Sequence, residues 1–93
     1  MTRVAYSKHA LEKMRVRFVS KRQVGDALRN PDFSFEDVES STLVAVKRYR
    51  KMHVVVIFAS KDDLVRVVTV YHASDVDSLI RKKLQRGAWP VKR

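Results

Sequence analysis

The stretch SKHALEKMRVRFVSKRQVGDALRNPD, residues 7–32, decides the first half of the fold because it carries two helix start signals. Ser7 is a typical N-cap residue, and it predicts a first helix that runs to about Arg17. Ser20, followed three residues later by Gln23, is the capping-box pattern of a second helix. The stretch therefore predicts two short helices joined as a hairpin.

After Asn30-Pro31, which predicts the end of the second helix, the pattern becomes that of strands. Alternating or β-branched runs follow one another, namely FSFEDVES, TLVAVKRY, HVVVIFAS and LVRVVTVYH. The polar breaks between them are short enough for hairpins. A last helix is predicted from Ser74 to Gly87. We expect an α+β fold in which two N-terminal helices pack on a three- or four-stranded antiparallel sheet, followed by a C-terminal helix.

Helical periodicity also predicts which side chains face the core. His9, Lys13 and Arg17 share one face of the first helix, whereas the apolar residues of that helix and Phe18 share the other. Together with apolar positions of the second helix and the strands, this predicts a core that includes Leu11, Met14, Val24, Leu28, Val56, Phe58, Val68 and Val70.

The composition limits the classes of protein to consider. Ninety-three residues predict a single domain spanning 1–93. The absence of cysteine excludes disulfides and a cysteine nucleophile. No apolar run approaches the roughly 18 residues of a membrane-spanning helix, and the N-terminus has no apolar signal core. These observations predict a cytoplasmic protein without a membrane partner.

Positive charge is the most informative part of the composition. The net charge is +10, the segment KRYRK occupies residues 47–51, and residues 81–93 contain six basic residues and no acid. Such an excess favours RNA or an acidic protein as the partner. The predicted nucleic-acid-binding residues are Lys47, Arg48, Tyr49, Arg50, Lys51, Arg81, Lys82, Lys83 and Arg86.

In its order of elements and its charge, the chain resembles the RelE/ParE toxin superfamily. Within it, residues 7–73 are similar to small uncharacterised domains that neighbour BrnT, leaving residues 74–93 as a basic helix and tail. Their signature combines Ser/Thr-x-His-Ala, Met, Arg-x-Ile/Val-Ser and Asn-Pro. This chain matches it with Ser7, His9, Ala10, Met14, Arg17, Val19, Ser20, Val24, Leu28, Asn30 and Pro31.

The resemblance implies cleavage of mRNA without a metal or cofactor, by attack of a 2′-hydroxyl on the adjacent phosphate. That reaction needs a base, an acid and cations that stabilise the phosphorane. The catalytic candidates are His9, Arg17, Arg66, Tyr71 and His72. Strand alternation places Arg66 and His72 on one face and Tyr71 on the other, unless a bulge intervenes.

Three functions are therefore considered. The first is an endoribonuclease of a type II toxin-antitoxin pair, acting on mRNA alone or on the ribosome and neutralised by an acidic antitoxin. The second is a non-catalytic nucleic-acid-binding or regulatory module with the same fold. The third is a ParE-like topoisomerase inhibitor.

Overall fold

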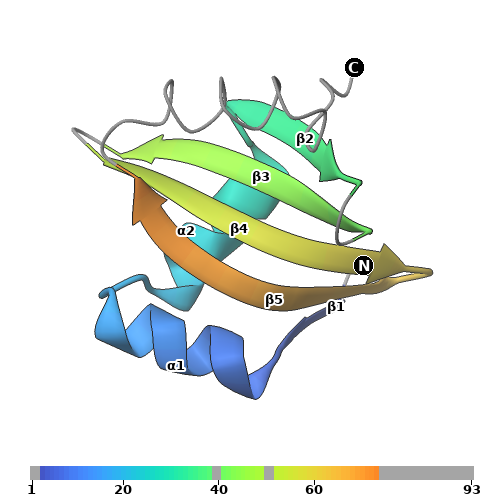
Figure 1. The fold of residues 1–93 in the computed structure, drawn as a ribbon, viewed down its shortest axis with the longest axis horizontal. Coiled ribbons are helices and arrows are strands. Elements are labelled where there is room, and N and C mark those ends of the chain that lie inside the picture. Colours follow the sequence, from blue (N-terminus) through green and yellow to red (C-terminus); the bar gives the residue numbers. More distant parts are fainter. Residues whose placement is uncertain (1–2, 39–40, 50–51, 74–93) are drawn as a thin grey trace.

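A computed structural model describes residues 3–38, 41–49 and 52–73 of the chain. Within these residues, two helices lie on one face of a five-stranded sheet (Figure 1). The elements in chain order are β1 (Arg3–Tyr6), α1 (Lys8–Val16), α2 (Lys21–Arg29), β2 (Phe33–Asp37), β3 (Thr42–Tyr49), β4 (Met52–Lys61) and β5 (Leu64–Ala73).

The two helices begin as their sequence signals predict. The Ser7 hydroxyl accepts a hydrogen bond from the Ala10 N–H at 3.0 Å and caps α1. At α2, the Ser20 hydroxyl accepts from the Gln23 N–H at 3.1 Å, and Gln23 Oε1 accepts from the Ser20 N–H at 3.0 Å. The predicted capping box is therefore confirmed, and so are the two short helices.

The predicted fold class is wrong in its sheet. The strand order is β1-β5-β4-β3-β2, and only β2 to β5 form an antiparallel meander. Strand β1 pairs with β5 in parallel, from Arg3 opposite Leu64 to Tyr6 opposite Val67, so the sheet is mixed. Four residues are too short to show a strand period, and only pairing with β5 defines β1. The predicted C-terminal helix lies outside the described residues.

A β-bulge interrupts β5 where the chain leaves β1 for α1. Phe58 of β4 is opposite Val67, but Ile57 is opposite Thr69, which leaves Val68 unopposed. The Ser7 N–H donates to the Val67 carbonyl at 3.0 Å, and the Ser7 hydroxyl donates to the Val68 carbonyl at 2.9 Å. The N-terminus of α1 is thereby attached to β5 at the bulge.

The main core lies between the helices and the sheet. Helix α1 packs on β5, and α2 packs on β4 and β3. Most predicted core residues are buried or half-buried, but Leu11 is not, because 45% of its surface is exposed. Phe18, predicted on the same helix face, is 89% exposed. The buried residues of this core are Ala10, Met14, Val19, Val24, Ala27, Val54, Val56, Val67 and Val70.

A second apolar cluster occupies the face of the sheet turned away from α1 and α2. Phe35, Val44, Val46 and Val55 are buried there, and Ile57 and Tyr71 pack against them. Val54, Val55 and Val56 of β4 are all buried, so this strand is covered on both faces. In the part of the chain that the structure describes, no helix is long and apolar enough to cross a membrane.

Candidate nucleic-acid interface

The β5 bulge rearranges the predicted catalytic residues of the last strand. Residues opposite each other in a sheet share a face, so Arg66 (opposite Ala59) lies on the face of Tyr71 (opposite Val55). His72 is opposite Val54 and lies on the helix face. The alternation predicted without a bulge is therefore wrong for Arg66, which is exposed near the start of the strand.

His9 and Arg17 lie at opposite ends of α1. His9 is exposed in the first turn, beside the Ser7 cap that contacts Val67 and Val68. Arg17 is the C-cap residue, about 12 Å further along the helix axis at 1.5 Å per residue. The structure therefore does not bring His9 to the end of β5, and the five predicted catalytic residues do not form one cluster.

Arg17, Tyr71 and His72 are the predicted catalytic residues that the structure does bring near one another. Arg17 Nη1 donates to the Val70 carbonyl at 3.4 Å, and the guanidinium carbon lies 5.9 Å from the centre of the Tyr71 ring. His72 is the next residue along β5 and is half-buried on the opposite face from Tyr71. These three residues surround the C-terminal part of the last strand.

The Tyr71 phenol is neutral at neutral pH. Burial raises its pKa above the ordinary value, and the negative charge of Asp37 raises it further, whereas the positive charge of Arg17 lowers it. A phenol in this state donates a proton or a hydrogen bond and does not serve as a phenolate base.

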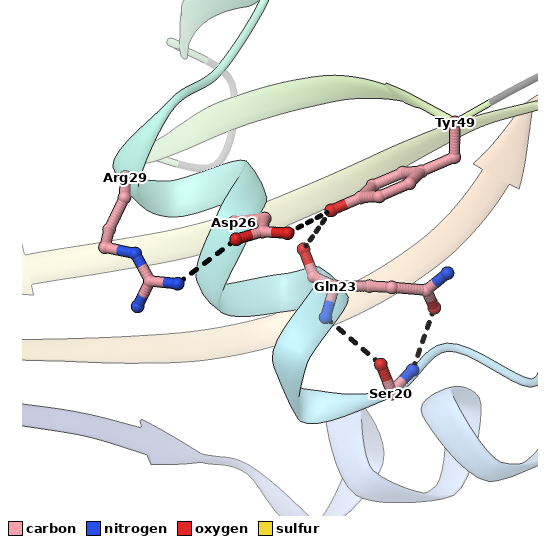
Figure 2. A network of polar contacts seen from close by, with 5 residues as sticks. All are labelled: Ser20, Gln23, Asp26, Arg29 and Tyr49. Carbon is pink, nitrogen blue, oxygen red and sulfur yellow. Dashed lines mark hydrogen bonds and ion pairs between the residues drawn. The ribbon is translucent and has the colours of Figure 1, made fainter.

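Tyr49 of the KRYRK segment links the sheet to α2. Figure 2 shows its hydroxyl pointing at Asp26, to which it donates at 3.1 Å, with the Gln23 carbonyl oxygen at 3.4 Å as a second acceptor. Asp26 also pairs with Arg29 at 3.1 Å. Burial raises the pKa of the Tyr49 phenol, and the Asp26 hydrogen bond and charge raise it further. Tyr49, predicted to bind nucleic acid, is half-buried, and its hydroxyl is held by α2.

Of the other predicted nucleic-acid-binding residues, the structure describes Lys47 and Arg48. Lys47 is half-buried and has an Asp32 carboxylate oxygen at 4.0 Å, whereas the Arg48 side chain is exposed. The remaining predicted residues, Arg50, Lys51, Arg81, Lys82, Lys83 and Arg86, lie outside the described residues.

Sequence reasoning did not treat the two helices together as a charged surface. Residues 7–30 contain seven Lys or Arg and only two acids, a formal charge of +5. Among the residues that the structure describes, only Arg29 of these seven cations forms an ion pair. Arg17 contacts Val70 and Tyr71, and Lys21 Nζ lies 5.2 Å from the centre of the Tyr6 ring. We call the five cations other than Arg17 and Arg29 the unpaired helix cations, because they form no ion pair: Lys8, Lys13, Arg15, Lys21 and Arg22. A simple count of charge per predicted helix would have indicated this surface.

Sequence reasoning also missed Phe18. Its ring is 89% exposed, and its backbone has φ 55°, in the left-handed region. The apolar periodicity of the first helix placed Phe18 on the same face as Leu11 and Met14, but α1 ends before this residue. Because the Phe18 backbone is in the left-handed conformation, the helical period of α1 does not extend to its side chain.

No metal site is found within the described residues, where no group of three or more His, Asp or Glu side chains has the arrangement to hold an ion. The predicted site residues in the described part are cations, phenols and imidazoles. The arrangement suits anion binding better than proton transfer, because the candidate acid and base groups are spread over both faces and both ends of β5.

Residues 6–72 match a family described as a domain of unknown function, DUF4258, and the chain belongs to that family. No curated protein and no solved structure matches the chain. The relation to the RelE/ParE superfamily and to the neighbours of BrnT stays a prediction.

Proposed function

We propose that the chain binds single-stranded RNA through the surface formed by α1 and α2. The observation that carries the proposal is the set of unpaired helix cations, which leaves most of the helix charge available to an anionic ligand. Lysine and arginine that neutralise phosphates release condensed counterions, and this release supplies much of the affinity for nucleic acid.

Binding without catalysis is favoured over catalysis by the positions of the predicted catalytic residues. Arg17 contacts Val70 and Tyr71 near the end of β5. His9 lies at the other end of α1 from Arg17, and Arg66 lies near the start of β5. A general acid and a general base must both come within hydrogen-bond reach of the same reacting group. Cations that contact a flexible strand need only be accessible. Four of the unpaired helix cations are exposed, and Lys13 is half-buried.

The direct test is the affinity of the full chain for a labelled single-stranded RNA oligonucleotide, measured by fluorescence anisotropy. Replacement of both Lys21 and Arg22 by Ala should weaken binding. Lys61→Ala is the matched control. Lys61 is also an exposed cation, but it lies at the β4–β5 turn, away from the start of α2 (Figure 1). Equal affinity of the double variant and the control would contradict the proposal.

A second candidate function is the metal-independent endoribonuclease of a toxin-antitoxin pair. The specific observation in its favour is the approach of Arg17 to Tyr71, with His72 next in the strand. Arg17 would supply charge to the phosphorane, His72 would act as a base and the neutral Tyr71 phenol would act as an acid.

A single-turnover RNA cleavage assay, with and without ribosomes, tests this second candidate. Arg17→Ala and His72→Ala should abolish cleavage while the thermal unfolding of His72→Ala stays near that of the unmodified chain. His9→Ala should cleave normally, because His9 is at the other end of α1. If the unmodified chain cleaves no RNA, the nuclease candidate is wrong and RNA binding is the function that remains.

An acidic antitoxin and a cytoplasmic location belong to the same proposal. Positive charge that suits phosphates also suits an acidic peptide, and co-purification from the native host at low salt tests for one. The ParE-like alternative stays a prediction, which a topoisomerase inhibition assay would test.

A further inference from the structure

The connection between α1 and α2 contains an aromatic residue where a glycine is usual. The Phe18 N–H donates to the Arg15 carbonyl at 3.4 Å, and the Val19 N–H donates to the Met14 carbonyl at 2.9 Å. These two bonds are the Schellman motif that ends a helix, in which one residue adopts the left-handed conformation. Phe18 holds that position with φ 55°. An L-residue with a large side chain is strained there, and glycine is not.

Packing does not account for the aromatic ring. Of the large apolar side chains in the described residues, Phe18 is the most exposed, at 89%. The next residue, Val19, is 4% exposed and fills the core position that completes the Schellman motif. Phe18 is therefore unfavourable at its position both for its backbone and for its exposed apolar surface.

The start of α2 carries charge of the unfavourable sign. Lys21 and Arg22 are exposed in its first turn, which contains no acid. Cations oppose the positive end of the helix dipole and destabilise the helix, whereas the same end attracts anions. The ammonium of Lys21 lies 5.2 Å from the centre of the Tyr6 ring, and this contact offsets part of the cost. Residues 18–22 thus combine a strained backbone, an exposed apolar ring and two cations at the positive end of a helix, and such combinations concentrate at functional sites.

We infer that Phe18 is the stacking residue for an unpaired base of the bound RNA, with Lys21 and Arg22 contacting the phosphates beside it. The inference rests on the proposed RNA binding and adds the chemical basis for a preference for single strands. A base stacks on an exposed side chain only where it is not already stacked in a duplex. Alternation of one aromatic ring with nearby cations is how proteins bind single strands without reading their sequence.

The test is the affinity of Phe18→Gly for a single-stranded uridine oligonucleotide, measured with the full chain. Loss of one stacked base should weaken binding roughly 5- to 150-fold. Thermal unfolding of the same variant should occur at the same or a higher temperature, since glycine accepts φ 55° without strain. Phe18→Asn, which also tolerates the left-handed region, is the second variant. Phe18→Trp should retain binding.

Val16→Ala is the matched control, because Val16 is also an exposed apolar residue, at 60%, but lies outside the connection. Its affinity should equal that of the unmodified chain. Salt dependence separates the two proposals: Phe18→Gly should keep the slope of log affinity against log salt, since no phosphate contact is removed.

Three results would overturn the inference. If Phe18→Gly binds the oligonucleotide as well as the unmodified chain does, while that binding depends steeply on salt, RNA binding stands and Phe18 has no part in it. If the unmodified chain binds no RNA but binds vesicles of phosphatidylserine, and Phe18→Gly loses that binding, the ring inserts into lipid. Failure to bind either ligand overturns the inference together with the proposed function.

Discussion

The guanidinium carbon of Arg17 lies 5.9 Å from the centre of the Tyr71 ring, and Arg17 Nη1 donates to the carbonyl oxygen of the preceding residue, Val70. Arg17 is the C-cap of α1, so these contacts attach the end of the helix to the last strand. The spacing of His9, Lys13 and Arg17 suggests one charged face, but only Arg17 among these three makes contacts of this kind.

Arg17→Ala should therefore lower the free energy of unfolding by about 1 kcal/mol, because it removes a cation–π contact and a hydrogen bond. Urea unfolding measures the change. Arg15→Ala is the control, since Arg15 is exposed and should change stability by less than about 0.5 kcal/mol. If both variants unfold alike, Arg17 belongs to a solvated charged face after all.

Tyr49→Phe should also cost about 1 kcal/mol, with the ring and its packing retained. The substitution removes the hydrogen bond to Asp26 and leaves a carboxylate oxygen without its donor. Ser20→Ala, which breaks the capping box of the same helix, should have an effect of similar size. Unchanged stability of Tyr49→Phe would mean that the network in Figure 2 does not hold α2 to the sheet.

All three tyrosines of the chain should titrate above the ordinary pKa of 10.0 in the folded state. Burial is the largest cause at each, because it disfavours the phenolate. A raised folded pKa favours folding at pH values below the unfolded pKa. This stability should be lost as the pH rises through the folded values.

Tyrosinate absorbance measured during an alkaline titration tests this, with the chain in guanidinium as the reference for ordinary tyrosine. A tyrosine that ionises below 10.0 in the folded chain would contradict the account. It would also supply a second candidate base, besides His72, for the nuclease reaction.

The helix signals and the meander could be predicted from the sequence because they depend on neighbouring residues. Ser7, Ser20 and Gln23 act within one turn of their own helices. Strand β1 could not be predicted in this way, because its partner is sixty residues further along the chain and nothing within RVAY indicates it. The β5 bulge likewise depends on where Ser7 meets Val67 and Val68.

The candidate site was predictable only in its overall charge. The bulge changes the face on which Arg66 lies, which no alternation within LVRVVTVYH indicates. Phe18 was placed on the apolar face of the first helix because the helical period was extended past the residue where α1 ends. Tyr49 was predicted to bind nucleic acid because it is an aromatic residue among cations. Its hydroxyl instead donates to Asp26 of α2, which is distant in the sequence.

The salt dependence of single-stranded RNA binding tests the central claim most directly. Each phosphate that the chain neutralises should contribute about −0.7 to the slope of log affinity against log salt concentration. Replacing Lys21 and Arg22 together by Ala should therefore make the slope shallower by about 1.4, while Lys61→Ala should leave it unchanged. An affinity that does not change with salt, or a slope that the double variant shares with the unmodified chain, would contradict the claim that the helix surface binds RNA.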